Sequence, residues 1–126
     1  MGKTARRSIN SKNLVTSLFL SLLTYYAVRD SLDRVIESFR DKQTRSLFED
    51  RLVPKFRSIE RQARRRLLYL HQAKILSDLA ALPGSRLEKL SGDRRGQYRI
   101  RINDQWRVCF RWKDGRAHDV EITDYH

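Results

Sequence analysis

Alternating apolar and polar residues predict a β-hairpin in the second half of the chain. Every second residue is apolar between positions 98 and 102 and again between 106 and 112. These apolar positions are Tyr98, Ile100, Ile102, Trp106, Val108, Phe110 and Trp112. Asn103 and Asp104 stand between the two runs, and both residue types tolerate the left-handed backbone of a tight turn. The predicted hairpin has an apolar face, which another element must cover, and a face rich in arginine.

Two more strands are predicted beside this hairpin. Residues 85–90 are expected to be extended, with Leu87 pointing inward, and a polar loop follows at 91–96. An Asp-Gly pair at 114–115 is a strong signal for a second tight turn. In the strand after it, the positions expected on the apolar face are His118, Val120 and Ile122. The whole pattern predicts an antiparallel meander of about four strands.

Apolar residues at helical spacing precede the sheet. Residues 41–52 predict one helix, which Asp41 or Thr44 caps and Pro54 ends, because proline lacks an N–H donor. Its buried stripe is expected to be Leu47, Phe48 and Leu52. Just before this helix, Val35, Ile36 and Phe39 predict a short strand or the approach to one.

A second helix is predicted at 58–71, with a short helical turn after it at 77–82. Its apolar stripe is Ile59, Ala63, Leu67 and Leu70. Its other side carries Arg57, Arg61, Arg64 and Arg65. These arginines are dense and are expected to lack ion-pair partners. The helix side is therefore either solvated or in contact with nucleic acid or an acidic protein, and the sequence leaves both interpretations open.

The order of these elements indicates an α+β domain, in which two N-terminal helices pack on one face of a small antiparallel sheet. A chain of 126 residues with 40% hydrophobic residues is enough for one such domain and not for two. We expect the domain at 33–126 and an N-terminal extension at 1–32. The extension begins with a basic segment and continues into an uncharged run at 14–28. It is interpreted as a signal or anchor, as an extra helix, or as the product of a start codon set too early, and the third is slightly favoured.

The chain carries a formal net charge of +12, which indicates a polyanionic partner such as nucleic acid, an anionic membrane surface or an acidic protein. Arginines of the sheet and its loop are the candidate RNA-binding residues, because guanidinium groups bind phosphate oxygens bidentately. They are Arg94, Arg95, Arg99, Arg101 and Arg111. Asp119 and Glu121 are expected to neutralise only part of this set.

Few residues suit other kinds of site. The sequence has no Cys/His cluster with zinc spacing and no glycine-rich phosphate loop after a strand, so catalysis is expected to need no metal. The single cysteine, Cys109, permits no intrachain disulfide and is expected to be buried or half-buried.

The last three residues, Asp124, Tyr125 and His126, are the candidate catalytic groups, together with Arg107. RNA is cut without metal when its 2′-hydroxyl attacks the adjacent phosphate, which needs a base, an acid and cations around the phosphorane. Histidine titrates near neutrality, so His126 suits proton transfer. Tyr125 is a candidate for proton transfer or base stacking, and Arg107 for binding the phosphorane.

Several short motifs resemble the HigB toxins of the RelE/ParE superfamily. In chain order they are Leu82-Pro-Gly-Ser-Arg-Leu, Leu90-Ser-Gly-Asp-Arg, Gly96-Gln-Tyr-Arg-Ile-Arg-Ile-Asn-Asp-Gln-Trp-Arg-Val-Cys-Phe and the terminal Asp124-Tyr125-His126. The segment from Ser46 to His71 resembles the helical pair of the same family. The resemblance covers roughly 33–126.

This resemblance implies a RelE-like fold and a ribosome-dependent mRNA endonuclease that cuts translated mRNA in the ribosomal A site without a metal or other cofactor. It also implies action in the bacterial cytoplasm, neutralisation by a HigA-type helix-turn-helix antitoxin, and no membrane partner. The matching functional positions are Arg107, Tyr125 and His126, with Asp124 beside them.

Two positions depart from the family pattern. Ser91 stands where many members have a lysine, and Glu88 where some have a histidine. These changes remove a cation and a candidate base, so the identity of the general base stays open. Glu88 is either that base or an ordinary residue of the strand surface.

Three other functions remain open at the level of sequence. One is a non-catalytic RNA- or ribosome-binding module on the same scaffold, which the loss of lysine at Ser91 favours. Another is a ParE-like topoisomerase inhibitor, against which the Asp-Tyr-His ending argues. The last is a secreted basic protein, which rests only on residues 1–28.

Overall fold

The structure is a computed structural model that describes residues 22–23 and 36–125. The predictions for the rest of the N-terminal extension, for Val35 and for His126 lie outside the described residues. The helical elements are α3 (Lys42–Phe48), the 3-10 helix η1 (Pro54–Ile59), α4 (Glu60–Gln72), α5 (Leu76–Ala80) and the 3-10 turn η2 (Gly92–Arg94). The strands are β1 (Glu88–Lys89), β2 (Gln97–Arg101), β3 (Trp106–Lys113) and β4 (Arg116–Asp124).

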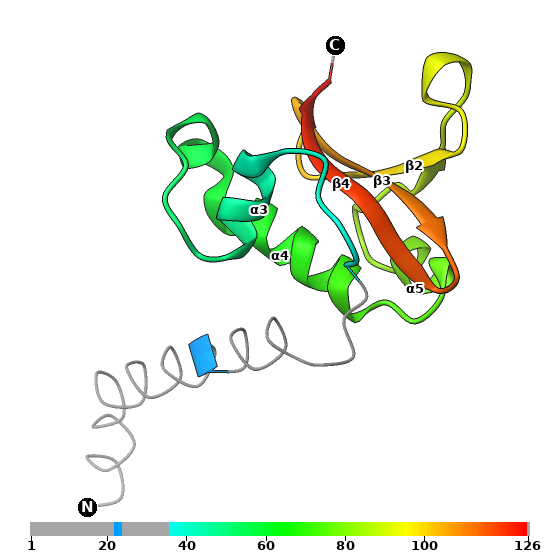
Figure 1. Cartoon of the computed structure of the whole chain (residues 1–126), viewed down its shortest axis with the longest axis horizontal. Helices are drawn as coiled ribbons and strands as arrows, with labels where there is room; N and C mark the ends of the chain where they lie inside the picture. Colours follow the sequence, from blue (N-terminus) through cyan, green and yellow to red (C-terminus); the bar gives the residue numbers. More distant parts are fainter. Residues whose placement is uncertain (1–21, 24–35, 126) are drawn as a thin grey trace, which may run out of the picture.

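The four strands form one antiparallel sheet in the order β1-β2-β3-β4, which is the predicted meander. Helices α3 and α4 lie on one side of this sheet (Figure 1). The apolar core fills the space between them, and its largest fully buried side chains include Phe56, Leu67, Leu70 and Phe110. The predicted α+β class, with two helices on one face of the sheet, is confirmed.

Helix α3 begins as predicted but ends earlier. The Asp41 side chain accepts a hydrogen bond of 3.0 Å from the Thr44 backbone N–H, which caps the first turn. The helix ends at Phe48, and Asp50 then adopts a left-handed φ of 66° that no helix continues. Leu52 is consequently 78% exposed, so the prediction that it joins the buried stripe was wrong. Pro54 begins η1, where its missing N–H costs nothing.

Helix α4 has the predicted buried stripe, in which Ala63, Leu67 and Leu70 are fully buried. The prediction for Arg64 was wrong, because its side chain is half-buried and paired. It forms an ion pair with Glu60, another with Asp50 at 3.5 Å, and donates to the backbone carbonyls of Leu47 and Arg51. Arg64 therefore joins α4 to the end of α3 and is not part of an exposed basic side.

The hairpin of β2 and β3 has the predicted alternation, with Ile100 opposite Val108 and both buried. The predicted left-handed turn was wrong, because neither Asn103 nor Asp104 has a positive φ. The Asn103 side-chain oxygen instead accepts from the backbone N–H groups of Gln105 at 2.9 Å and Trp106 at 2.8 Å. Hydrogen bonds to the Asn103 side chain, and not a left-handed backbone, therefore stabilise this turn.

Strand β4 contains an irregularity that the alternation did not predict. The register with β3 shifts between Cys109 and Arg111, and Asp119 has a φ of 51°. His118 is therefore opposite Arg111. The sequence pattern placed His118 on the apolar face. The buried residue is Ala117 instead, so that prediction was wrong. The Asp114–Gly115 turn has the predicted left-handed backbone at both residues.

The outer edge of β4 is held by residues from the N-terminal part of the domain. Ile36 and Phe39 form isolated parallel bridges to Ala117 and Val120, which confirms a short strand-like approach in this segment. The buried Thr44 hydroxyl accepts a hydrogen bond of 3.0 Å from the Ile122 backbone N–H. These contacts fix the strand that leads to the C-terminal residues.

The chain around β1 is less regular than predicted. Only Glu88 and Lys89 form a strand, because Arg86 has a φ of 46° and interrupts the extended backbone. The buried Ser85 hydroxyl donates to the Leu79 carbonyl at 2.6 Å, which holds the loop against α5. Glu88 is nevertheless paired with Arg99, so β1 brings one carboxylate to the arginine face.

Candidate functional site

The arginine face is the side of the sheet that turns away from the helices. Ile100 and Val108 point into the core, so strand alternation directs Arg99, Arg101 and Arg107 to the opposite side. Arg101 and Arg107 are direct partners in the antiparallel register of β2 and β3. Three guanidinium groups therefore gather at the end of the hairpin.

Tyr125 lies among these arginines. The centroid of its ring is 4.3 Å from the guanidinium carbon of Arg107 and 4.5 Å from that of Arg99, which is cation–π geometry. The Tyr125 backbone N–H donates to the Gln105 carbonyl at 2.5 Å, so the end of β4 is held by the β2–β3 turn. The side chain remains 40% exposed, which leaves part of the ring open to a ligand.

Arg107 is fixed by backbone atoms. Its Nη1 donates to the carbonyl of Asn103 and to that of Trp106, the second at 3.1 Å. No ion pair among residues 36–125 includes it. Burial, and then the charges of Arg99 and Arg101, lower the pKa of Arg107 from the usual arginine range. An arginine still keeps its proton at neutral pH, so the site holds an oriented cation without a carboxylate partner.

Four other arginines of this face have carboxylate partners. The pairs are Arg94–Glu121 at 3.4 Å, Arg99–Glu88 at 2.9 Å, Arg101–Asp104 at 2.5 Å and Arg111–Asp119 at 3.7 Å. The prediction that Asp119 and Glu121 neutralise part of the set is confirmed. Such exposed pairs contribute only about 0–1 kcal/mol each, so a phosphate group can compete with the carboxylates.

Two guanidinium nitrogens of this face are poorly satisfied. The Nε atoms of Arg99 and Arg101 are buried and have no hydrogen-bond partner among the described residues. A buried donor without an acceptor lowers stability by about 1–3 kcal/mol.

The predicted site residues divide into two groups along the sheet. Arg111 is opposite Gln97 at the other end of β2, and Arg94 donates to the Gln97 side chain at 2.9 Å. Four residues of extended strand place Arg111 about 13 Å from Arg107. Arg94 is half-buried, not exposed as its loop position suggested, whereas Arg95 is exposed. These three residues extend the basic face but do not contact Tyr125.

Asp124 is not on the same side as Tyr125. It is the register partner of Trp106, a buried residue of the apolar face, and its carboxylate accepts from the Gln105 side chain at 3.2 Å. Alternation therefore directs Asp124 away from the arginine cluster. His126 follows directly in sequence and lies outside the described residues.

The structure also locates the two positions that depart from the family pattern. Glu88 is exposed and accepts from Arg99, the residue that stacks on Tyr125. Ser91 is exposed and precedes η2. Cys109 is buried, as predicted, with its sulfur 3.4 Å from the Thr123 hydroxyl.

Within residues 22–23 and 36–125, no three His, Cys, Asp or Glu side chains gather as metal ligands do. The same part of the chain contains no helix that is long and apolar enough to span a membrane.

The basic side of α4 was predicted from the sequence only in part. Arg61 and Arg65 were identified there, but Arg66 and Tyr69, which line a cleft with them, were not. The spacing of these four residues along the helix would have revealed them as one stripe.

A small antiparallel sheet with helices on one face and arginines around a C-terminal tyrosine on the other defines a RelE-like toxin. Residues 37–126 match the family described as RelE-like toxin of type II toxin-antitoxin system HigB, and the chain belongs to this family. A curated relative, Toxin HigB-1 of Vibrio cholerae serotype O1 (strain ATCC 39315 / El Tor Inaba N16961), is 42% identical over 91 residues, which cover 69% of this chain and 94% of the relative. The resemblance seen in the sequence is thereby confirmed, and a type II system implies a protein antitoxin as partner.

Proposed function

We propose that this toxin is an endoribonuclease that cuts translated mRNA on the ribosome by metal-independent attack of a 2′-hydroxyl. One observation carries the proposal: the half-exposed Tyr125 ring lies within 4.5 Å of the guanidinium carbons of both Arg99 and Arg107. An aromatic ring beside fixed cations suits a single RNA strand, because a base stacks on the ring while the cations bind the phosphate.

The proposed reaction needs no group from outside the chain and the RNA. The 2′-oxygen forms a bond to the adjacent phosphorus as the bond to the 5′-oxygen breaks. A base takes the proton from the 2′-hydroxyl, and an acid gives a proton to the leaving 5′-oxygen. The products are a 2′,3′-cyclic phosphate and a 5′-hydroxyl end.

Arg107 is the proposed phosphorane ligand. Two backbone carbonyls hold its guanidinium, and no carboxylate of residues 36–125 neutralises it. A cation that is already oriented stabilises developing negative charge without reorganisation, and removing one such group costs about 10²–10³ in rate. Arg99 supplies a second positive charge beside the same ring.

Tyr125 and His126 are the proposed proton-transfer or base-stacking groups. The 2.9 Å contact of Glu88 with Arg99 favours a role for Glu88 in positioning that arginine, rather than as a free base. Asp124 contributes through the backbone geometry of the strand end, because its side chain faces the other way. Arg94, Arg95, Arg101 and Arg111 extend the surface that binds RNA.

The proposed partners are the ribosome with its mRNA and a HigA-type helix-turn-helix antitoxin, in the bacterial cytoplasm. Family membership supports an antitoxin as such. The charge of +12 supports a partner made of RNA.

The test is induced expression of the whole chain without antitoxin, with sequencing of new mRNA 5′ ends. We expect growth arrest and 5′-hydroxyl ends in frame with codons. Arg107→Ala should remove both the growth arrest and the new ends. Arg116→Ala is the control on the same sheet. It loses an exposed ion pair with Glu37 and should retain both effects. Purified protein should cut the mRNA only when it is bound to ribosomes.

Arrest without new ends would refute the nuclease. If the purified protein also bound ribosomes tightly, the result would favour the alternative of a non-catalytic ribosome-binding module. That alternative is supported by Ser91, which offers no cation where many family members have a lysine.

A further inference from the structure

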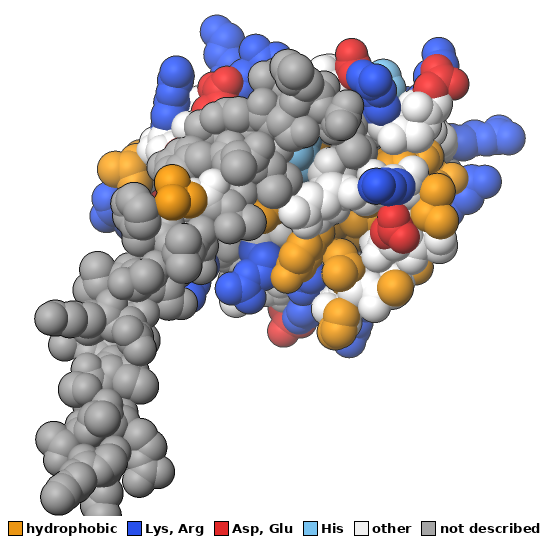
Figure 2. Space-filling view, turned by 90° about the horizontal axis from the view of Figure 1, so that it is seen from below, with side chains coloured by type: hydrophobic (Ala, Val, Ile, Leu, Met, Phe, Trp, Pro, Cys, Tyr) orange, Lys and Arg blue, Asp and Glu red, His pale blue; other side chains and the backbone are white. Residues whose placement is uncertain are grey.

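Arg86 lies at the edge of the arginine face, on the segment that leads into β1. Basic side chains stand at several separate places on the face seen in Figure 2, so charge alone does not distinguish one arginine from another. Arg86 differs from the rest in its strained backbone and its anchored neighbours. It is exposed, and no ion pair among residues 36–125 includes it. It is not among the site residues that were predicted from the sequence.

A β-bulge places Arg86 beside Arg101. Glu88 is opposite Arg99 in the antiparallel register of β1 and β2. If the register continued by two residues, the backbone N–H of Arg101 would donate to the carbonyl of Arg86. It donates instead to the carbonyl of Ser85, at 2.6 Å. Ser85 and Arg86 therefore share one partner on β2, which is the arrangement of a bulge and changes the direction of a side chain at a sheet edge.

The bulge holds Arg86 in a left-handed backbone conformation, with a φ of 46°. This conformation is unfavourable for residues that have a Cβ, except where a short polar side chain forms local hydrogen bonds. The other non-glycine residues with a positive φ in the described part of the chain are all aspartates, namely Asp50, Asp114 and Asp119. An arginine gains no such local compensation, so the strain at Arg86 points to a function of its side chain.

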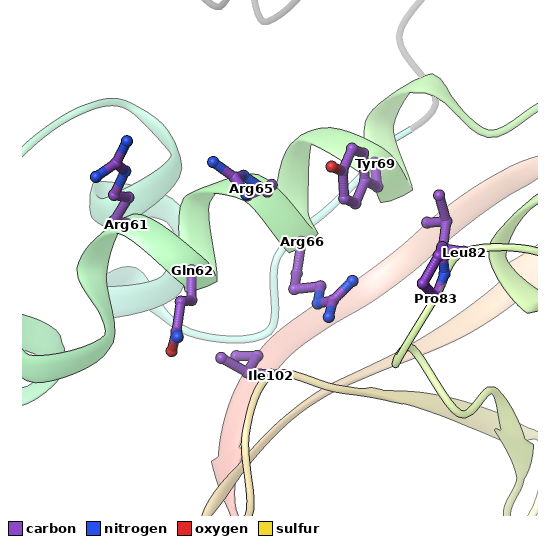
Figure 3. Close-up of a pocket in the computed structure, with 8 residues that line it drawn as sticks. All are labelled: Arg61, Gln62, Arg65, Arg66, Tyr69, Leu82, Pro83 and Ile102. Carbon is purple, nitrogen blue, oxygen red and sulfur yellow. The ribbon is translucent and has the colours of Figure 1, made fainter.

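Residues on both sides of Arg86 hold its strained backbone in place. The buried Ser85 hydroxyl donates to the Leu79 carbonyl at 2.6 Å, and the Ser85 backbone N–H donates to the Leu82 carbonyl at 3.2 Å. Figure 3 shows Leu82 on this loop, which lies beside α4. After Arg86, the half-buried Leu87 packs against the core. A fixed backbone therefore presents the exposed guanidinium of Arg86.

The positive charge of Arg86 acts on the same carboxylate as the charges of the arginine face. A hydrogen bond and the charge of Arg101 lower the pKa of Asp104, and the charges of Arg107 and Arg86 add to this effect. The Asp104 side chain is 100% exposed, so its ion pair with Arg101 contributes little to stability. A phosphate that replaces this carboxylate meets Arg101 and Arg86 together.

We infer that Arg86, together with Arg101, binds the RNA phosphate next to the one that Arg107 contacts. The segment of Arg86 and the strand of Arg107 are separated by β2, so their backbones lie about 10 Å apart, which suits two phosphates of one strand better than a single phosphate. The inference rests on the proposed binding of RNA at the arginine face. The phosphate at Arg86 does not react, so Arg86 contributes to affinity for RNA and to the placement of the strand.

The test measures how variants of the whole chain bind a short unstructured RNA with 2′-fluoro sugars, which cannot be cut, at several salt concentrations. Each phosphate contact on a single strand adds about 0.7 to the slope of log K against log salt concentration, because bound counterions are released. Arg86→Gln removes the charge, so it should reduce this slope by about 0.7 and raise Kd by about tenfold. Arg86→Lys should keep the slope of the wild type.

Two control variants match the two changes made at Arg86. Lys89→Gln removes the same charge from the same strand, but at an exposed position whose register partner, Tyr98, packs against the core on the other face. It should leave Kd within about threefold of the wild type, because steering by distant charge is weak compared with direct pairing. Arg86→Gly also relieves the backbone strain, so its affinity should fall while its melting temperature stays the same or rises. Asp114→Gly, where φ is 53°, relieves strain in the same way and should not weaken RNA binding.

An unchanged salt slope in Arg86→Gln would overturn the inference. Equal losses of affinity in Arg86→Gln and Lys89→Gln would overturn it as well, because net charge alone would then explain the effect. A lowered melting temperature in Arg86→Gly would assign the residue to the fold and not to RNA, and a wild-type toxin that does not bind this RNA would also refute the contact. Cleavage of mRNA on ribosomes is measured separately. If the wild type binds the RNA as expected and cuts no mRNA, only the proposed nuclease activity falls.

Discussion

A substitution of Arg107 is the sharpest test that separates its proposed catalytic role from a role in stability. In Arg107→Ala, the fold loses two hydrogen bonds to backbone carbonyls, each worth about 1 kcal/mol net, and one cation–π contact of about 0.5–2 kcal/mol. The same change relieves repulsion from Arg99 and Arg101, the like charges that contribute to lowering the pKa of Arg107. We therefore expect a net loss of about 1–2 kcal/mol in the free energy of unfolding.

A loss of that size does not unfold the protein. Domains of this kind have unfolding free energies of about 5–15 kcal/mol, so more than about 99% of the variant stays folded at 25 °C. Removing an oriented cation from a phosphorane costs about 10²–10³ in rate. The fall in cleavage is thus expected to exceed the fall in folded fraction by at least about a hundredfold.

The assay is single-turnover cleavage of mRNA on programmed ribosomes, with thermal unfolding measured on the same samples. Arg107→Lys keeps the charge but loses the planar fork, so its rate should lie between those of Arg107→Ala and the wild type. Cleavage by Arg107→Ala within about threefold of wild type would refute the role of Arg107. Loss of the cooperative unfolding transition in Arg107→Ala would refute the stability argument instead.

Three further predictions concern the scaffold. Leu67→Ala, at a fully buried position of α4, should lower the free energy of unfolding by about 2–5 kcal/mol in urea, and a change below about 1 kcal/mol would contradict the assigned core. Thr44→Val leaves the buried Ile122 N–H without its acceptor and should cost about 1–3 kcal/mol, whereas Thr44→Ser should cost less; equal effects would argue against the hydrogen bond. Gly96→Ala should destabilise by about 1 kcal/mol in thermal melts, because φ is 90°, a backbone conformation that residues with a Cβ rarely adopt, whereas the nearby Arg111 guanidinium can move aside; an unchanged melting temperature would contradict the strain at this position.

Periodic patterns account for the parts of the fold that were predicted correctly. The period of two gave the β2–β3 hairpin with its arginine face, and the helical period gave the buried stripe of α4. Both patterns depend on neighbours in sequence, so they need no knowledge of the rest of the molecule. The turn at Asp114–Gly115 was predicted for the same reason, because its left-handed backbone depends on those two residues alone.

The errors arose where distant residues decide the local conformation. The end of α3 at Phe48 leaves Leu52 exposed. Arg64 has a local partner in Glu60, four residues earlier, but Asp50 and the carbonyls of Leu47 and Arg51 come near it only in space. The bulge at Asp119 caused an error of the same kind. It moves His118 off the apolar face within a single strand, which alternation cannot anticipate.

The sequence by itself determined the elements, the basic character and the family of this toxin, because periodicity, charge and motif order are linear properties of the chain. Only the tertiary structure decided which arginines meet Tyr125 and which have carboxylate partners. Strand register sets those distances, and register depends on the turn at Asn103 and on packing against the helices. The same packing separates the cleft on α4 that Arg61, Arg65 and Arg66 line from the sheet face, since the core lies between the two basic surfaces.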